Sequence, residues 1–277
     1  QNRVMLLTGA YRTGTTWVGK TIRREPGIAY IHEPFNPDGD YADSDFNYRF
    51  PSSFYHVPGS GVESEVLARF EDRFAMTPPN ARPFLKDPLA VLSAGWLYEQ
   101  FDCDVVCLIR NPLAFAGSLK HWAWNVDFRA ILEQEPLVAA HLESFREELT
   151  VFSKQQQDVV DQAALLWNCI YSTVVDYRRS FPSWLFVRHE DLALDPINGF
   201  LEIYSHYGLS LPVETRVFIG KYTTGSRVQA ERPECRPLNA RESLKSWQRR
   251  LTAQEVDRVI AATAEVASEF YELDAGC

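Results

Sequence analysis

The sequence lacks several features that would decide its class at once. No apolar segment reaches the roughly 18 residues that a membrane-spanning helix needs, and no signal peptide is recognisable. Positive charge is also scarce, because 28 Lys and Arg residues stand against 37 Asp and Glu residues. A general nucleic-acid binder carries a basic surface, so the net charge of −9 argues against that class. An anionic ligand would therefore have to be bound by local arginines and backbone amides.

Cysteine is sparse as well, and its spacing argues against a metal site. No C-x-x-C pair, the spacing typical of zinc ligands, occurs among the five cysteines, which are Cys103, Cys107, Cys169, Cys235 and Cys277. We expect buried thiols in a reducing compartment, and hence a cytoplasmic protein. Because the first residue is Gln1 rather than methionine, we also expect the chain to be a domain of a longer protein.

What the sequence does contain is a regular alternation of two kinds of segment. Short apolar runs predict strands, at 3–8, 28–31, 82–87, 105–109 and 184–188. Longer runs with helical periodicity predict helices, at 15–24, 62–74, 89–100, 113–124, 157–179, 197–207 and 253–271. This alternation is typical of an α/β fold in which helices flank a central parallel sheet. Repeats and low-complexity tracts are absent, so we expect one domain over residues 1–277.

Two segments stand out as candidate binding elements. Residues 36–60 are rich in Pro, Gly, Asp and aromatic residues, a composition too aromatic for a linker and too irregular for a core element. Long ordered loops of this kind are often binding loops. Residues 127–150 are predicted to be helical and to form a cap. We expect the aromatic loop 41–55 and this helical segment to line one side of a ligand-binding cleft.

The turn after the first predicted strand has the spacing of a phosphate-binding loop. Residues 9–16 read Gly-Ala-Tyr-Arg-Thr-Gly-Thr-Thr, which matches G-x-x-x-x-G but has threonines in place of the Lys-Ser/Thr of nucleoside triphosphatases. Such a loop directs backbone amides at an anion near a helix N-terminus. Without the lysine, the ligand must be held by Arg12 and the hydroxyls of Thr13, Thr15 and Thr16. This suits a phosphosulfate held without metal better than a triphosphate held with magnesium. Taken alone, the segment is also compatible with an ordinary strand-turn-helix.

Residues 12–17 read Arg-Thr-Gly-Thr-Thr-Trp, and residues 105–119 read VVCLIRNPLAFAGSL. These segments resemble the 5′-phosphosulfate loop and the 3′-phosphate element of cytosolic and carbohydrate sulfotransferases. Such enzymes use 3′-phosphoadenosine-5′-phosphosulfate (PAPS) as donor and release adenosine 3′,5′-bisphosphate (PAP). The resemblance implies a P-loop-type fold, donor contacts from Arg12 to Thr16, and an adenine contact from Trp17. It also implies that Arg110 and Ser118 bind the 3′-phosphate, which an arginine can grip with two N–H groups.

Two further segments resemble the same family less closely. Residues 186–196, FVRHEDLALDP, resemble the segment that bears an aromatic residue near the adenine, a position that His189 occupies here. A histidine in the core or facing solvent is the alternative. Residues 244–256, LKSWQRRLTAQEV, resemble the family's final element, but the Arg-Lys-Gly phosphate clamp upstream of it is not intact. Arg241 alone lies in register with that clamp.

The same resemblance narrows the choice of catalytic base, the group that takes the proton from the acceptor hydroxyl. Cytosolic sulfotransferases use the histidine of a Lys-x-His turn, whereas this sequence has Lys86-Asp87-Pro88, so Lys86 matches and the histidine does not. Carbohydrate-type members carry the base in a Glu-Pro turn, which here is Glu33-Pro34. We expect Glu33 to lie at a strand end with a raised pKa and to act as the base. A surface glutamate in a turn or salt bridge is the alternative, and the reserve candidates are Asp87 and His32.

These observations predict a PAPS-dependent sulfotransferase that acts on a hydroxyl acceptor, with Arg12 and Lys86 assisting Glu33 and with no metal. The Glu-Pro turn favours a carbohydrate or glycolipid acceptor, while the aromatic loop also fits a lipid, a polyketide or another small-molecule alcohol. The competing interpretations are a P-loop kinase or nucleotide hydrolase, which would need the missing lysine, and a non-catalytic nucleotide-binding module.

Overall fold

The computed structural model describes residues 3–36, 53–223 and 244–271. Its centre is a parallel sheet in the order β2-β3-β1-β4-β5, formed by Met5–Gly9 (β1), Ile28–His32 (β2), Arg82–Lys86 (β3), Asp104–Ile109 (β4) and Leu185–Arg188 (β5). Leu7 of β1 pairs with Lys86 of β3 on one side and with Val106 of β4 on the other. The predicted α/β fold with one central parallel sheet is confirmed.

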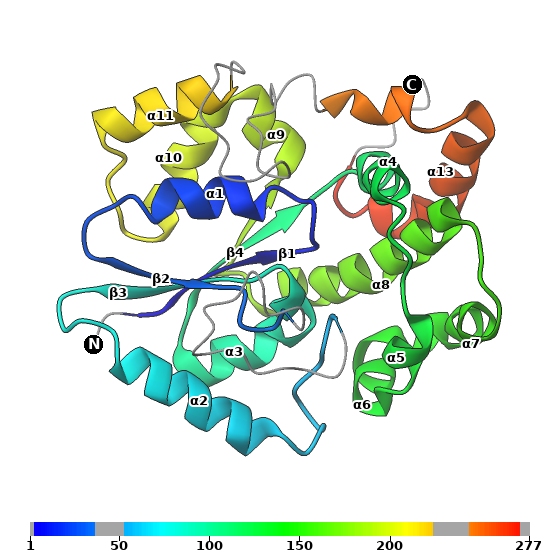
Figure 1. Ribbon diagram of the computed structural model, residues 1–277, viewed down its shortest axis with the longest axis horizontal. Coiled ribbons are helices and arrows are strands. Elements are labelled where there is room, and N and C mark those ends of the chain that lie inside the picture. Colours follow the sequence, from blue (N-terminus) through cyan, green and yellow to red (C-terminus); the bar gives the residue numbers. More distant parts are fainter. Residues whose placement is uncertain (1–2, 37–52, 224–243, 272–277) are drawn as a thin grey trace.

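Helices cover both faces of this sheet (Figure 1). One face carries Thr15–Ile22 (α1), His189–Leu194 (α9), Pro196–His206 (α10) and Val213–Thr223 (α11). The opposite face carries Glu63–Ala75 (α2) and Ala94–Phe101 (α3). Beyond the carboxyl ends of the strands lie Pro112–Trp122 (α4) and Ala253–Ala267 (α13). The long helix Val159–Ser180 (α8) runs from there to the face that carries α3, where Tyr177 lies against Gly95. Both α4 and α13 pack on the long helix α8.

Alternating residues of the central strands divide the core into two apolar clusters, one on each face. Leu6 of β1 and Cys107 of β4 belong to the cluster that includes Trp167 of α8. Leu7 of β1 and Leu108 of β4 belong to the cluster that includes Phe200 of α10. Because both faces of these strands are buried, β1 and β4 read as continuous apolar runs, which is why the sequence predicted them.

The structure differs from the sequence-based prediction in three places. Helix α9 begins at His189, directly after β5, where no helix was predicted. Helix α11 was not predicted, because its apolar residues do not mark its inner face: Val213 and Val217 are exposed, while Thr215 and Ile219 are buried. The predicted helix at 89–100 begins as a 3-10 helix, Leu89–Ser93 (η1), before α3.

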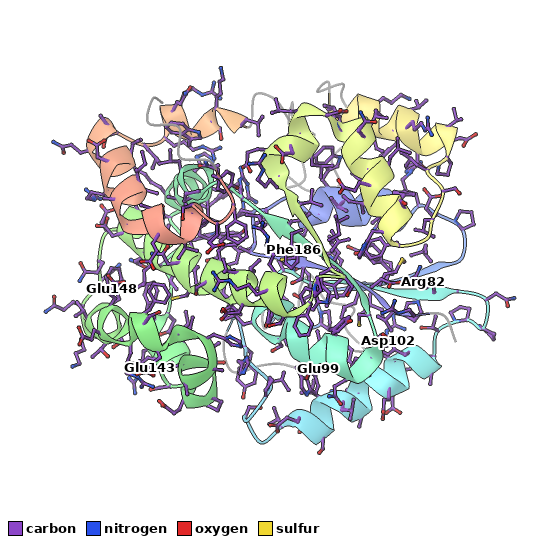
Figure 2. The ribbon with its side chains drawn as sticks, turned by 180° about the vertical axis from the view of Figure 1, so that it is seen from behind. Arg82, Glu99, Asp102, Glu143, Glu148 and Phe186 are labelled. Atoms are coloured by element: carbon purple, nitrogen blue, oxygen red, sulfur yellow. The ribbon has the colours of Figure 1, made fainter. Side chains whose placement is uncertain are left out.

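The segment 127–150 is helical, as predicted. It contains Phe128–Leu132 (α5), Glu135–Leu137 (α6), a π-helical turn at Val138–Leu142 (η2), a 3-10 turn at Glu143–Phe145 (η3) and the start of Arg146–Lys154 (α7). Figure 2 shows Glu143 and Glu148 of this segment on one side of the molecule, and Arg82 and Asp102, at the amino ends of strands, on the other side. The helical segment therefore lies on the side toward which the carboxyl ends of the strands point.

Three of the predicted buried thiols are confirmed, since Cys103, Cys107 and Cys169 are buried and free. Cys235, Cys277 and most of the aromatic loop 41–55 lie outside the described residues. In the part of the chain that the structure describes, no helix combines the length and the apolar character needed to cross a membrane.

Candidate active site

The residues predicted to form the site follow the carboxyl ends of all five strands. The loop 10–14 follows β1, Glu33 follows β2, Lys86 ends β3, Arg110 follows β4 and His189 follows β5. Parallel strands place their carboxyl ends along one edge of the sheet. The central strand β1 has β2 and β3 on one side and β4 and β5 on the other, so the strand order reverses at β1. Such an edge is where open α/β sheets bind ligands.

The phosphate-type loop owes its shape to two glycines. Gly9 has φ 136° and Gly14 has φ 94°, conformations that strain any residue with a Cβ atom. A Cβ atom on Gly14 would also lie 2.6 Å from Nδ1 of His189. Inside the loop, the Thr13 hydroxyl donates to the carbonyl of Ala10 at 2.6 Å. The N-cap of α1 is Gly14, which has no side chain to bind the first-turn amides, so these amides can face an anion.

The side chain of Arg12 reaches from this loop to helix α4. Its Nε donates a hydrogen bond to the Ser118 hydroxyl at 3.0 Å, and Ser118 is buried. The guanidinium carbon lies 5.6 Å from the ring centre of Trp122 and 5.7 Å from that of Trp124. Both distances are within the range of a cation–π contact. The structure thus joins Arg12 and Ser118, which the sequence had assigned to opposite ends of the donor.

Arg110 is buried beside the same loop. Its guanidinium donates to the carbonyl oxygen of Arg12, while its Nε has no hydrogen-bond partner among the described residues. Burial lowers the pKa of Arg110, and the charge of Arg250 lowers it further, although Glu190 opposes both. A buried cation with an unpartnered N–H is suited to an anionic ligand.

The backbone around Arg110 is fixed by the core. Trp167 donates its indole N–H to the Arg110 carbonyl at 2.8 Å, and the Arg110 amide donates to the Tyr171 hydroxyl at 3.1 Å. The next residue, Asn111, caps α4 by accepting from the amide of Leu113 at 2.9 Å. These contacts orient both Arg110 and the helix that carries Ser118.

His189 and Trp17 lie together beside the loop. Their rings meet edge to face, with centroids 6.4 Å apart, and Trp17 also packs against Phe200. Burial, together with the charge of Arg110, lowers the pKa of His189 to about 3, despite an opposing hydrogen bond to the Thr13 backbone. His189 is therefore a neutral, buried histidine. Its Nδ1 and the indole N–H of Trp17 have no partner within the described part of the chain.

Glu33 lies at the end of β2, with its carboxylate directed at Lys86. Lys86 Nζ donates to Oε1 of Glu33, and the Asn36 amide donates to Oε2 at 3.1 Å. Burial alone would raise the pKa of Glu33, but the charges of Lys86 and His32 and the two hydrogen bonds outweigh it and lower that pKa. The expected raised pKa is therefore wrong, because the sequence did not show the partners that stabilise the carboxylate. Glu33 is ionised at neutral pH, the form a base requires.

The reserve candidates differ from Glu33 in their surroundings. Asp87 is fully buried, and burial with the nearby charge of Glu33 raises its pKa to about 7. Its oxygens accept from the amides of Phe35 at 2.6 Å and Leu89 at 2.8 Å, so it holds the turn that follows Glu33. Burial, aided by the charge of Lys86, lowers the pKa of His32 to about 4. Its Nδ1 is 2.9 Å from the Tyr30 hydroxyl.

The sequence did not identify Arg250 as a site residue. The turn Ser246–Arg249 (η5) packs on α4, where a Cβ atom on Gly117 would lie 3.2 Å from Trp247 and 3.7 Å from Cβ of Arg250. Gly117 therefore allows the close approach that brings Arg250 next to the helix turn of Ser118. The segment's resemblance to the family's last element was the available signal. Arg241, which was predicted instead, lies outside the described residues.

Sequence comparison finds similar proteins of known name. No model of a known protein family matches the sequence. The chain is 26% identical to carbohydrate sulfotransferase 2 of Mus musculus over 194 residues, which cover 64% of this chain and 34% of that protein. The same protein of Homo sapiens is 25% identical over the same extent. The chain thus spans about a third of the length of the curated relatives it matches.

Solved structures share the fold across nearly the whole chain. The sulfotransferase domain of the Synechococcus PCC 7002 olefin synthase superposes with a TM-score of 0.55 at 13% identity, covering 98% of this chain and 95% of that chain. The mouse sulfotransferase SULT7A1, solved in complex with PAP, superposes with a TM-score of 0.53 at 15% identity, covering 96% of this chain and 84% of that chain. At these identities the likeness shows a common fold.

Proposed function

We propose that this chain, as a member of the sulfotransferase family, transfers a sulfuryl group from PAPS to a hydroxyl acceptor. The observation that carries the proposal is the grouping of Arg12, Arg110 and Ser118 around a lysine-free phosphate loop, with Glu33 at the same edge of the sheet. Three cationic or hydroxyl groups suit the two anionic ends of the donor, and an ionised carboxylate nearby suits deprotonation of an alcohol.

In this proposal the donor is bound by both ends. The backbone amides of residues 13–16, the hydroxyls of Thr15 and Thr16, and Arg12 hold the 5′-phosphosulfate. The Thr13 hydroxyl, which was expected to hold it too, instead donates to the Ala10 carbonyl inside the loop. Arg110 and Ser118 hold the 3′-phosphate, with Arg250 serving in place of the clamp that the sequence lacks. Trp17 and His189 lie on the adenine side, and Arg241 remains a predicted contact. The mouse sulfotransferase with the same fold was solved with PAP, the product that this donor leaves.

The chemical step follows from the charges around Glu33. Glu33 accepts the proton of the acceptor hydroxyl, whose oxygen forms a bond to sulfur while the bond from sulfur to the phosphate oxygen breaks. Negative charge then grows on that leaving oxygen, where Arg12, Lys86 and the loop amides stabilise it. Lys86 also fixes the Glu33 carboxylate in place by donating to Oε1. Asp87 positions the same turn through the amide of Phe35.

The proposed acceptor is a carbohydrate hydroxyl, alone or in a glycolipid. The support is the sequence similarity to carbohydrate sulfotransferase 2 and the Glu-Pro turn at residues 33–34. A lipid, polyketide or other small-molecule alcohol is the alternative acceptor.

Nucleotide binding tests the proposal most directly. We expect calorimetry in the presence of EDTA to show tight binding of PAP and weak binding of ATP with or without magnesium. Arg12→Ala should impair donor binding and turnover together. Arg110→Ala should lower the affinity for PAP by about tenfold or more, since a charged hydrogen bond contributes roughly 1.5–3 kcal/mol. It should leave the affinity for 5′-AMP nearly unaffected.

Each competing function predicts a different outcome. Preference for ATP with magnesium would overturn the proposal in favour of a P-loop kinase or nucleotide hydrolase. Tight PAP binding without sulfate transfer to any hydroxyl would indicate a nucleotide-binding module. Equal loss of PAP and 5′-AMP affinity in Arg110→Ala would make Arg110 a structural residue.

A further inference from the structure

Two tryptophans stand exposed next to the phosphate loop. Trp122 is 39% exposed and Trp124 is 41% exposed, although both belong to a residue type that usually buries most of its surface. Each ring lies within cation–π distance of Arg12. The Trp124 ring also meets Tyr11 of the loop edge to face, with centroids 5.4 Å apart. The exposed rings are therefore held in place beside the position proposed for the reacting sulfuryl group.

A polar pocket begins at the residue after Trp124. Its volume is about 250 Å³, and its polar lining comes from Asn125, Asp127, Arg129, Ser153, Lys154, Gln155, Gln156, Gln157 and Gln162. Pockets that enclose a whole small-molecule ligand measure about 300–1,000 Å³. This pocket is smaller, so it suits one unit of a longer ligand whose remainder lies outside it.

A buried side-chain amide, that of Gln162, holds the residues around the pocket in place. Gln162 of α8 is buried, and its side-chain oxygen accepts from the amide of Val126 at 2.8 Å. Its nitrogen donates to Asn125 Oδ1 at 3.2 Å and to the Gln157 carbonyl at 2.7 Å. Two further lining residues, Phe128 and Phe152, meet edge to face with ring centroids 5.3 Å apart. These contacts order the residues that line the pocket. One of them, the exposed Gln156, donates to Asn125 Oδ1 at 3.5 Å.

The chemistry of this surface matches a sugar chain better than an alkyl chain. An indole ring offers a flat apolar face in a wet setting, which complements the C–H face of a sugar ring. Amide and carboxylate groups complement the hydroxyls at the ring edges. A lipid chain would instead require apolar lining, whereas the side chains that line this pocket are predominantly polar or charged.

We propose that Trp122, Trp124 and the pocket lined by Gln156 form the acceptor subsite, and that the acceptor is an oligosaccharide. The indole rings stack on the sugar that receives the sulfuryl group, and the pocket binds a neighbouring sugar of the same chain. This inference rests on the proposed sulfotransferase function. It places the acceptor on the side of the sheet edge where the helical segment 127–150 lies.

The test uses the intact chain, PAPS labelled with ³⁵S, an array of monosaccharides and oligosaccharides, and a parallel array of long-chain alcohols and lipids. We expect label on oligosaccharides in preference to their constituent monosaccharides. Trp124→Ala and Gln156→Ala should each lower that transfer about tenfold, a loss of roughly one favourable contact. PAP affinity, measured by calorimetry, should stay within a factor of about two.

Matched controls isolate the subsite. Gln100→Ala removes an exposed amide from α3, and Ile260→Ala removes an exposed apolar side chain from α13, so both should transfer at the unmodified rate. Sulfate transfer to long-chain alcohols but to no glycan would overturn the inference. So would equal rates of transfer to glycans in the two subsite variants and in the two controls. Failure to bind PAP would instead overturn the proposed function, so the two failures are distinct.

Discussion

Lys86 donates a hydrogen bond to Oε1 of Glu33, and this contact joins the carboxyl ends of two neighbouring strands. The Lys86 side chain is fully buried and that of Glu33 is 14% exposed. A buried pair of this kind needs both partners, because removing one leaves an uncompensated charge. The pair keeps the candidate base ionised and holds it at the edge of the sheet where the phosphate loop lies.

The first prediction concerns Glu33 as the base. Glu33→Gln keeps the size of the side chain but cannot accept a proton, so we expect turnover to fall by roughly 10²–10⁴-fold. PAP affinity should hardly change, because the base contacts the acceptor. Turnover on a labelled oligosaccharide and calorimetry with PAP measure the two effects. Near-normal turnover in this variant would move the role to Asp87 or His32.

The second prediction concerns pH. The pKa of Glu33 is lowered in the folded protein, so the active, ionised form persists through neutral pH and is lost only as the pH falls below the usual carboxylate range. Lys86→Met removes the cation while burial remains, which should raise the pKa of Glu33 and move the acid limb of the pH–rate profile to higher pH. Lys221→Met, an exposed lysine on α11, should leave that limb in place. An unmoved limb in Lys86→Met would show that Glu33 is not the titrating base.

The third prediction concerns Arg250. From its position beside α4 we expect Arg250→Ala to lower the affinity for PAP about tenfold, since a charge-assisted hydrogen bond contributes roughly 1.5–3 kcal/mol. The affinity for 5′-AMP should not change. Arg249→Ala removes the same charge from the neighbouring, exposed residue and serves as the control. If both variants weakened PAP equally, the effect would come from long-range charge rather than from a contact.

The fourth prediction concerns Gly14. Gly14→Ala places a Cβ atom 2.6 Å from His189 at φ 94°, so it combines backbone strain with a clash at the loop 9–14. Gly208→Ala has comparable strain at φ 66° but nothing within 4 Å of the new atom. An alanine at positive φ costs about 1–2 kcal/mol, which thermal unfolding should show for both variants. Only Gly14→Ala should also lose PAP affinity. Normal PAP binding by Gly14→Ala would show that the loop does not hold the donor.

Much of this site could be predicted because its elements are local in sequence. The glycine spacing at residues 9–14 specifies a loop that few other residue types allow, and the apolar runs around 5–9 and 104–109 specify buried strands. Parallel strands then bring the ends of all five strands to one edge, so Arg12, Glu33 and Arg110 were expected near one another before their contacts were known. The sequence analysis did not single out Trp122, Trp124 and Arg250. The spacing of residues along the chain predicts neither the exposure of a side chain nor its packing against another helix.

The sequence by itself therefore determined the α/β fold, the phosphate loop and the residue types of the site, since each depends on short-range patterns of side-chain size, polarity and backbone freedom. Only the tertiary structure decided how those residues act on one another. It paired Glu33 with Lys86 and so lowered a pKa that was expected to be raised, and it joined Arg12 to Ser118 across 106 positions. It also set Arg250 against Gly117. Electrostatic interactions depend on distance and burial, and both arise only when segments far apart in the chain pack together.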